Sequence, residues 1–330
     1  MKTFLFALLL ANIFPLIDGT DTDHTHFRLR QVAKGVWAAI HKNPGGHAIC
    51  NAGIIDLGDK TVLIDPFMNL DAAEELKTTA IKLTGRDAGI VINTHCHNDH
   101  IRGNQLFASS SIISTEWTRE EIARAEPREI QWEKENAPAI LSAYQSQLAT
   151  AQGLQKRELP LWIDYFEGMI KSNPKLKTTL PGITFNDSLW LYGAERSILL
   201  KEYKNGHTKS DVAVFLPQEK ILFTGDLLFT GAHPWLSDGN PAQLKKYLDE
   251  WAADTRYTIF VPGHGDTGNR ENVQLLSGYI SDLTQMVAEQ KNNGVPDSLI
   301  IKTPIPAAYA EWLFGTRFYA ANLSFLCKEK

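Results

Sequence analysis

The stretch "NTHCHNDHIRGN", residues 93–104, places three histidines and an aspartate within six positions. The whole chain has only 10 histidines in 330 residues, so this density is unusual for the sequence. In an extended segment, residues two positions apart point the same way, which would direct His95 and His97 toward one point. Asp99 would continue this alternation, whereas His100 would point elsewhere. The stretch therefore predicts ligands for two adjacent metal positions.

Imidazole and carboxylate groups together suit zinc, and suit iron or manganese less well. A cluster at the end of one strand cannot complete a tetrahedral site, so further ligands must come from elsewhere in the chain. Three candidates share one setting, because each directly follows a glycine at the end of an apolar run or in a turn. They are His207 in "NGHTKSD", Asp226 in "ILFTGDLLF" and His264 in "FVPGHGD". Their common setting predicts that they join the cluster.

The elements around these residues follow an α/β pattern. Short apolar runs at "GVWAAIH", "HAICNAGIIDLG" and "TVLIDPF" predict consecutive strands, with a hairpin turn at 56–59. A helix is predicted at about 71–83, and the strand "GIVIN" then runs into the histidine cluster. Later strands are predicted at "SILLKEY", "DVAVFLP", "KILFTGD" and "YTIFVPGH". One helix is predicted at about 241–252, before the last of these strands, and a long one at about 269–290, after it. This order predicts α/β layering.

The middle of the chain, from about residue 114 to 177, is rich in charged residues and helix formers. Apolar residues recur there at helical spacing, and a second helix is predicted to begin near Pro160. We interpret this segment as a helical insert within one domain that spans residues 20–330. Its aromatic side chains either pack the insert onto the sheets or line an apolar pocket as a lid, with Trp162 as a candidate substrate contact.

The ordered pattern of histidines and aspartates resembles the metal-binding pattern of the metallo-β-lactamase-fold hydrolases, over about residues 36–268. The resemblance implies an αββα four-layer sandwich with two metals at one edge between its sheets. The ligands it implies are His95, His97 and His207 for the first metal, Asp99, His100 and His264 for the second, and Asp226 as a bridge. Asp65, at the end of the strand "TVLIDPF", is the implied acceptor that orients a ligand imidazole.

The implied cofactor is a pair of zinc ions, with iron or manganese as alternatives. Two such cations lower the pKa of a bridging water, so that hydroxide is available near neutral pH to attack a carbonyl or similar electrophile. Asp99 is the candidate for orienting this nucleophile or for passing a proton to the leaving group. Iron-dependent, oxygen-reducing relatives tend to carry an acidic residue at the position of His97, so a redox role is not expected.

Two sequence features reduce the range of substrates that the resemblance to this family implies. True β-lactamases usually carry cysteine or serine where this chain has Asp226, whereas thioesterase and phosphodiesterase relatives carry aspartate. Thioesterases that cleave glutathione conjugates have a shorter separation than the 106 residues between His100 and His207 here. The expected reaction is cleavage of a carboxylic ester, lactone or amide-type bond in an apolar small molecule. Phosphodiester or sulfate-ester hydrolysis, β-lactamase activity and a non-catalytic zinc protein are the alternatives.

Composition and the N-terminus bear on partners and location. The formal net charge is −5 without a basic stripe, so nucleic acid is not an expected partner. Residues 1–19 read as a signal peptide, because the apolar run is short for a membrane span and is interrupted by Asn12 and Pro15. A secreted or periplasmic protein without stable membrane association is expected, with its oligomeric state open.

Two further histidines are candidate substrate contacts. His47 lies in a loop that would overhang the site, and His233 follows shortly after Asp226.

Overall fold

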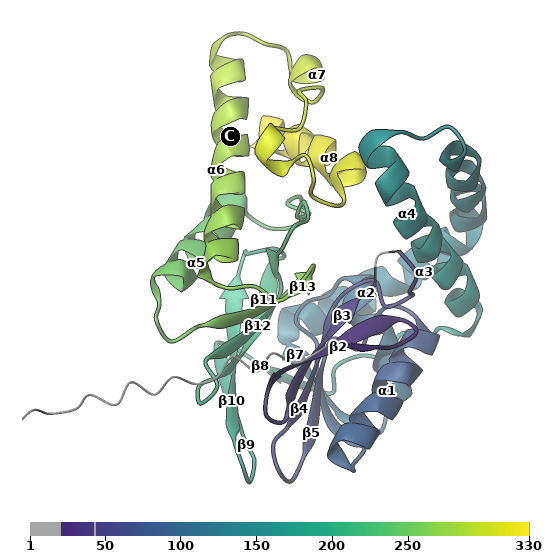
Figure 1. Cartoon of the computed structure of the whole chain (residues 1–330), viewed down its shortest axis with the longest axis vertical. Helices are drawn as coiled ribbons and strands as arrows, with labels where there is room; N and C mark the ends of the chain where they lie inside the picture. Colours follow the sequence, from purple (N-terminus) through teal and green to yellow (C-terminus); the bar gives the residue numbers. More distant parts are fainter. Residues whose placement is uncertain (1–20, 43, 330) are drawn as a thin grey trace, which may run out of the picture.

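The computed structural model describes residues 21–42 and 44–329, in which two β-sheets face each other and helices cover their outer faces (Figure 1). The predicted signal peptide at 1–19 lies outside the described residues. Among the described residues, no helix is long and apolar enough to cross a membrane, and the three cysteines are free.

The first sheet has eight strands that are ordered in space as they are in sequence. The strands are β1 (Thr22–Asp23), β2 (Phe27–Ala33), β3 (Val36–His41), β4 (Ala52–Asp56), β5 (Thr61–Ile64), β6 (Ala88–Ile92), β7 (Ser111–Thr115) and β8 (Ile183–Phe185). Pairing is antiparallel from β1 to β5 and parallel from β5 to β8. Helix α1 (Leu70–Thr84) makes the first parallel crossover and ends at Gly85, whose φ of 71° suits a left-handed cap.

The second sheet has five strands in the order β13-β12-β11-β10-β9. They are β9 (Ser188–Tyr192), β10 (Ser197–Lys204), β11 (Ser210–Leu216), β12 (Ile221–Phe229) and β13 (Ile259–His264). The first four strands form an antiparallel meander, and β13 joins β12 in parallel after the crossover helix α5 (Pro241–Ala253). Helix α6 (Arg270–Asn292) follows β13 and packs beside α5 on the outer face.

Apolar cores hold the layers together. The inner core lies between the sheets and is built from β-branched and aliphatic residues of both, such as Ile64 and Ile92 against Val214 and Val261. A second core joins α1 to the outer face of the first sheet, and a third joins α5 and α6 to the outer face of the second. Because each sheet buries both faces, its central strands read as nearly continuous apolar runs. The αββα sandwich expected from the sequence is thus confirmed.

The helical insert consists of α3 (Glu116–Leu148) and α4 (Gly153–Ser172), followed by the short 3-10 helix η2 (Asn173–Lys175). Helix α4 begins seven residues before Pro160, where the second helix was expected to start. The buried side chains of Glu158 and Leu159 hold that first part of α4 in place, so the helix continues through the proline. Arg102 ties the insert to the sandwich through buried ion pairs of 2.8 Å with Glu126 and with Glu133.

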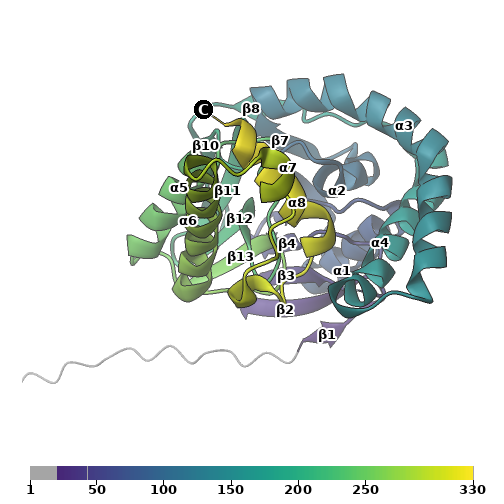
Figure 2. The same cartoon turned by 90° about the horizontal axis from the view of Figure 1, so that it is seen from above.

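The C-terminal segment contributes elements that the sequence pattern does not predict. They are α7 (Asp297–Ile300), the 3-10 helix η3 (Ala307–Tyr309) and α8 (Gly315–Lys328). Helix α8 lies between α6 and α4 in both views (Figures 1 and 2). Its first backbone N–H groups point at a buried carboxylate of α4, because Glu158 accepts from Gly315 N at 2.8 Å and from Thr316 N at 3.1 Å. The insert and the C-terminal helix therefore form one cover.

One predicted strand is shorter than expected. The run "HAICNAGIIDLG" becomes strand only from Ala52, because residues 47–51 form a loop in which Ile49 has a φ of 75°. Asn51 anchors this loop to the second sheet: its side chain donates to the carbonyls of Pro262 and Gly265, each at 2.8 Å. The loop is thereby held at the edge where β13 ends.

Candidate metal centre

The candidate ligands come from strand ends and turns of both sheets at one edge of the sandwich. His95 and His97 lie in the segment after β6, and Asp99 and His100 lie in the short helix α2 (Asn98–Ile101). The other three come from the second sheet: His207 from the turn between β10 and β11, Asp226 from within β12 and His264 from the end of β13. All seven residues that the sequence singles out are thus brought to one place.

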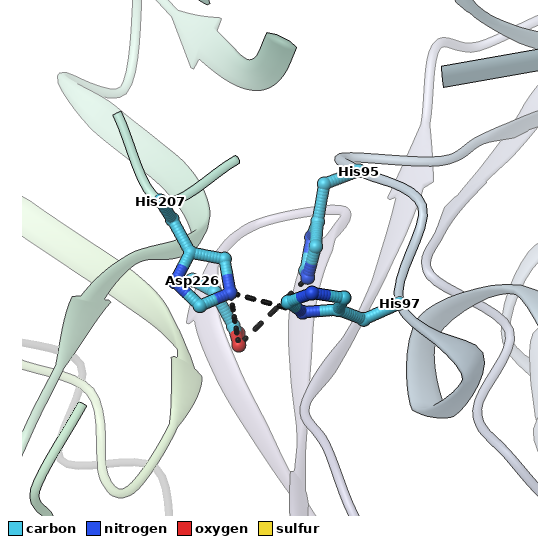
Figure 3. Close-up of side chains that lie close together, drawn as sticks. All are labelled: His95, His97, His207 and Asp226. Atoms are coloured by element: carbon cyan, nitrogen blue, oxygen red, sulfur yellow. Dashed lines mark hydrogen bonds and ion pairs between the residues drawn. The ribbon is translucent and has the colours of Figure 1, made fainter. Parts of the chain in front are cut away.

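The first group joins three imidazoles and one carboxylate, which point toward one another (Figure 3). His207 Nε2 lies 3.0 Å from His97 Nδ1 and 3.3 Å from Asp226 Oδ2, and His95 Nε2 lies 3.8 Å from the same oxygen. The three ring planes meet pairwise at 80° to 89°. Because an imidazole lone pair lies in its ring plane, planes that cross in this way allow three nitrogens to face one ion.

The second group consists of Asp99, His100 and His264. Asp99 Oδ2 lies 3.3 Å from His264 Nε2 and 3.5 Å from His100 Nε2. Asp226 reaches this group as well, since its Oδ1 lies 3.2 Å from His100 Nε2. Its Oδ2 faces the first group and also lies 3.5 Å from His264 Nε2. One carboxylate therefore stands between two sets of ligands.

Asp99 reaches the second group because it lies in a helical turn and not in the extended segment that the sequence predicts. The predicted alternation of an extended segment is wrong beyond His97, because residues 98–101 form a turn of helix. The helix turns Asp99 and His100 to the same side, toward His264. Cys50 Sγ contacts the carbonyl oxygen of Asp99 at 3.0 Å and helps to hold this turn.

Hydrogen bonds on the outer nitrogens orient three of the imidazoles. His95 Nδ1 lies 2.9 Å from Thr94 Oγ1, His100 Nδ1 lies 2.8 Å from Asp65 Oδ2, and His97 Nε2 lies 3.0 Å from Asp238 Oδ2. An outer N–H donated to each acceptor leaves the inner nitrogen with its lone pair directed into the cluster.

Asp65 serves two of these histidines from one buried position. Besides contacting His100, its carboxylate accepts from the Thr94 backbone N–H at 2.8 Å and from the Thr94 hydroxyl at 2.6 Å. The Thr94 hydroxyl is in turn the partner of His95. Asp65 directly follows β5 and has a φ of 50°, a strained conformation for a residue with a Cβ.

Two further aspartates support the centre and were not predicted. Asp238 is the partner of His97 and lies in the loop before α5, where no spacing pattern marks it. Asp211 shapes the turn that carries His207, because its carboxylate accepts from His207 N at 2.9 Å and from Thr208 N at 3.0 Å. Asp211 is the last residue of the stretch "NGHTKSD". Its position four residues after His207, in the same predicted turn, is the sequence feature from which its role could have been predicted.

The charges in the cluster are strongly coupled. Burial alone would raise the pKa of Asp226, but the neighbouring His264 and His100 hold that pKa well below its usual range. Burial alone would lower the pKa of His264, but Asp226 and its neighbours raise it to about 9. Burial dominates at His95 and His207, where it lowers the pKa, at His207 to about 4. The neutral imidazoles therefore offer lone pairs beside a carboxylate that stays ionised.

The donor set fits divalent metal ions. Three buried atoms at the heart of the cluster make no hydrogen bond: His95 Nε2, His100 Nε2 and Asp226 Oδ1. Buried polar atoms without partners are costly, and a cation between them would satisfy all three. Imidazole nitrogens with carboxylate oxygens are the ligands that suit zinc, iron or manganese.

A third group of potential ligands, His26, His47 and Asp71, lies outside this centre. The two rings are stacked with only 22° between their planes, so their lone pairs do not converge. Asp71 Oδ2 instead forms ion pairs with Lys171 Nζ at 2.7 Å and with His47 Nδ1 at 3.0 Å. His47, expected to contact substrate, thus belongs to an ion-pair network between α1 and the insert.

A cavity of about 450 Å³ opens onto both ligand groups. His97, Asp99, Asp226 and His264 line it on the metal side. The opposite walls are largely apolar and come from α4, α8, the end of β12 and neighbouring loops: Ile49, Leu161, Trp162, Tyr165, Phe229, Trp235, Phe314 and Phe318. Glu129, Asp238 and Arg317 add charged groups.

The other two candidate substrate contacts are placed differently from each other. Trp162 lines the cavity and also packs into the apolar core beneath it. His233 does not: it is fully buried behind α8, where its Nδ1 lies 2.9 Å from the Tyr279 hydroxyl. The backbone after β12 turns it inward, because His233 N donates to the carbonyl of Leu313 at 2.8 Å.

A family model described as the metallo-beta-lactamase superfamily matches residues 45–264, a span that contains both ligand groups. The chain belongs to the metallo-beta-lactamase superfamily. This superfamily member is 26% identical over 238 residues to a probable metallo-hydrolase of Methanocaldococcus jannaschii, over 68% of this chain and 92% of that protein. It is 25% identical over 255 residues to a type 2 metallo-beta-lactamase of Bacillus cereus, over 73% of this chain and 78% of that protein.

The fold of this superfamily member is also that of a solved metallo-beta-lactamase from Pontibacter korlensis. The two align with a TM-score of 0.56 and 17% identity, over 78% of this chain and 99% of that chain. Family, relatives and ligand chemistry together identify a metal-dependent hydrolase.

Proposed function

We propose that this protein is an exported dinuclear zinc hydrolase that cleaves a carboxylic ester, lactone or amide-type bond in a small molecule with an apolar body. The observation that carries the proposal is the position of Asp226 between two ligand groups, with its carboxylate oxygens within 3.5 Å of imidazoles of both groups, at the base of an apolar cavity. This arrangement supports two ions that share one carboxylate.

The division of the ligands supports two ions with different settings. The first group offers three imidazoles, and the second offers two imidazoles and the Asp99 carboxylate. When bound, a pair of zinc ions supplies Lewis acidity that activates water and stabilises a developing oxyanion. The residues of the chain hold the imidazoles in fixed tautomers through Asp65, Thr94 and Asp238.

Asp99 is suited to orient the nucleophile and to pass a proton. Its carboxylate lines the cavity on the substrate side and lies within 3.5 Å of two imidazoles. Burial opposes its ionisation, but His100 and His264 keep its pKa below the usual range. Asp99 therefore stays an acceptor, ready to take a proton that leaves the nucleophile.

The apolar walls support a substrate with an apolar body. Aromatic and aliphatic side chains of α4 and α8 surround the space in front of the ligands, and their burial of a substrate would also exclude bulk water. A carbonyl carbon activated toward attack can sit at the metal side while a hydrocarbon body contacts these walls. We therefore rank esters, lactones and amides before phosphodiesters and sulfate esters.

A β-lactam is a second candidate substrate, because one relative is named a type 2 metallo-beta-lactamase. A lactam ring is an amide, so its cleavage would use the same centre. Asp226, however, stands where true β-lactamases usually carry cysteine or serine. We therefore expect β-lactam hydrolysis, if measurable, to be slower than ester or lactone hydrolysis.

The test combines metal content with a substrate panel. Protein purified without chelators should contain about two zinc ions per chain, lose turnover on dialysis against a chelator and regain it on zinc addition. The panel contains an aryl ester, a lactone, a chromogenic cephalosporin and a bis-aryl phosphate at equal concentrations. Less than one metal per chain with chelator-resistant activity would overturn the mechanism. Preference for the bis-aryl phosphate would instead assign the phosphodiester alternative.

Export is tested separately from the chemistry. The full-length chain should be cleaved after residue 19 when a bacterial host expresses it, and the mature protein should appear in the periplasmic fraction. Intact-mass spectrometry of that fraction reads the cleavage site directly. A cytoplasmic protein that retains Met1 would contradict the assignment.

A further inference from the structure

We propose that Arg317, on helix α8, binds an anionic group of the substrate, so that the preferred substrates carry a carboxylate in addition to the bond that is cleaved. The inference rests on the proposed function and names a feature of its substrate. It also assigns substrate selection to a helix that lies outside residues 45–264, the part that matches the superfamily.

Arg317 lines the same cavity as the candidate metal ligands. Its guanidinium lies over the ring of Trp162, with its central carbon 4.6 Å from the ring centroid. Such stacking holds the plane of the guanidinium and covers one of its faces, while the N–H groups at its edge remain directed outward. The geometry is that of a donor held ready for a planar acceptor.

The guanidinium has no carboxylate partner among the described residues. Other arginines of the molecule do: Arg102 pairs with two glutamates, and Arg196 pairs with Glu219 at 2.8 Å. Glu129 lines the cavity too but does not come within ion-pair distance of Arg317. An unpaired guanidinium facing a cavity is a recognition site for a carboxylate, which it can bind through two parallel hydrogen bonds.

Arg317 also marks where a substrate can extend. It lines a neighbouring cavity of about 710 Å³ as well, together with Asn98, Glu129 and Tyr165. The side chain thus stands at the boundary between the two spaces. A substrate with its scissile bond at the metal side and its carboxylate on Arg317 would place its hydrocarbon body against Leu161, Phe314 and Phe318.

The chemical class that follows is an ester, lactone or amide with an apolar body and a carboxylate at some distance from the scissile carbonyl. The carboxylate and the apolar body of such a substrate would then contact different parts of the cavity. The metals would polarise the carbonyl, and Arg317 would select the anionic end. A neutral substrate of equal size would lack only the second interaction.

A matched pair of esters tests this directly: 4-nitrophenyl pentanoate and the mono-4-nitrophenyl ester of glutaric acid. Both have five acyl carbons and the same leaving group, and only the second carries a carboxylate. We expect Arg317→Gln to lower kcat/KM for the glutarate ester by about 10- to 100-fold and for the pentanoate by less than about threefold. Arg317→Lys should retain part of the preference, because the charge remains but the paired geometry is lost.

Arg270→Gln is the control, since it removes the same charge from an exposed arginine on α6 whose side chain contacts only the Asp254 carbonyl, at 3.5 Å. It should leave the ratio of the two esters unchanged. An unchanged ratio in a folded Arg317→Gln protein that still hydrolyses both esters would overturn the anion site and leave the proposed function standing. Equal loss on both esters would also overturn it.

Failure of the wild-type protein to hydrolyse either ester counts against the proposed function and not against Arg317. Binding then decides the role of Arg317. Calorimetry should show that 5-phenylpentanoate binds the zinc-loaded wild type more tightly than the Arg317→Gln protein by about tenfold or more, whereas 5-phenylpentanol should not distinguish them. Equal binding of the carboxylate to both proteins would overturn the inference.

Discussion

At the scale of single residues, function depends on which nitrogen or oxygen of each side chain faces inward. The Asp226 carboxylate lies within 3.5 Å of imidazoles of both ligand groups, and its pKa is kept low by these imidazoles, although burial opposes this. His95, His97 and His100 each direct one ring nitrogen to an acceptor outside the cluster. The residue types supply the ligand atoms, and the hydrogen bonds on the outer ring nitrogens direct the inner nitrogens into the cluster.

Replacing Asp226 by Asn should remove the shared carboxylate with little change in volume. We expect the metal content to fall from about two to about one per chain and kcat to fall by more than about 100-fold, because even the loss of an outer partner costs about 10- to 100-fold. Elemental analysis and steady-state kinetics measure the two effects. Asp249→Asn, which changes an exposed acid of α5 that pairs with Lys245, is the control. Full metal content in Asp226→Asn would contradict the bridging role.

Asp238→Asn should weaken metal binding through His97 without removing a ligand. The amide accepts less strongly from His97 Nε2, so we expect affinity for one of the two ions to fall by about 10- to 100-fold. Competition with a chromogenic chelator measures the dissociation constants. Trp235→Phe is the matched control, because Trp235 Nε1 donates to the same Asp238 oxygen at 2.9 Å. If both variants bind metal equally, the contact with His97 does not orient the ligand.

At the scale of elements, α4 and α8 form a cover that neither would form alone. Helix α8 has no side-chain cap of its own, and its N-cap residue Phe314 has a φ of 68°. Glu158 of α4 replaces that cap by accepting from two backbone N–H groups at the start of α8. The helix dipole favours a carboxylate at this end. One buried acid thus docks the helix that carries Arg317 against the helix that carries Trp162.

Glu158→Gln should therefore loosen this cover. The side-chain amide has one acceptor oxygen fewer and points N–H groups at the N–H groups of α8, so we expect a loss of about 1–3 kcal/mol in the free energy of unfolding. Urea denaturation followed by circular dichroism measures it. Glu167→Gln, on the exposed side of the same helix, should change stability by less than about 0.5 kcal/mol. A loss of equal size in both variants would mean that α8 is not docked by this contact.

At the scale of the whole molecule, the centre joins the two halves of the sandwich. Each ligand group combines residues that follow β6 with residues of the second sheet. Metal binding therefore bridges the sheets and should raise stability as well as supply chemistry. The same side chains also lie within ion-pair distance of one another, for example Asp226 Oδ2 and His264 Nε2 at 3.5 Å.

The pH dependence of stability should reverse with metal content. Although burial opposes it, Asp226 and its neighbours raise the pKa of His264 to about 9, above the unfolded value of about 6.5. The resulting stabilisation is fully present below about pH 6.5 and is lost as pH rises through about 9, by an amount on the order of 3 kcal/mol. Urea unfolding of the chelated protein at pH 6.5 and 9.0 should show this loss.

The zinc-loaded protein is the comparison for this experiment. Its imidazoles are held unprotonated by the metal, so its stability should change little over the same window and should fall on acidification, when protons displace the ions. A chelated protein whose stability is flat from pH 6.5 to 9.0 would contradict the ion-pair description of the cluster.

The sequence by itself determined the residue types of the centre and the layered fold. Apolar runs of strand length ended at histidines and aspartates in four places, and the alternation of strands and helices predicted α/β layering with a helical insert. The αββα order of the layers was implied by the family resemblance. These features are local in sequence, because a buried strand must be apolar and a metal ligand must be one of a few residue types. His95, His97, Asp99 and His100 were therefore visible as candidate ligands from their spacing alone.

The tertiary structure alone decided what surrounds these residues and which contacts produce the two ligand groups that the family resemblance implies. Asp226 faces both groups because β12 brings it between the strand ends of two sheets, a relation that no spacing encodes. The roles of Asp238, Glu158 and Arg317 depend on contacts with residues more than 100 positions away, which no local pattern in the sequence predicts. His47 and His233 were both candidate substrate contacts, but neither lines the cavity, because His47 pairs with Asp71 of α1 and His233 is buried behind α8. The chemistry of a side chain follows from the residue type alone, whereas the direction in which it points depends on contacts with residues distant in the sequence.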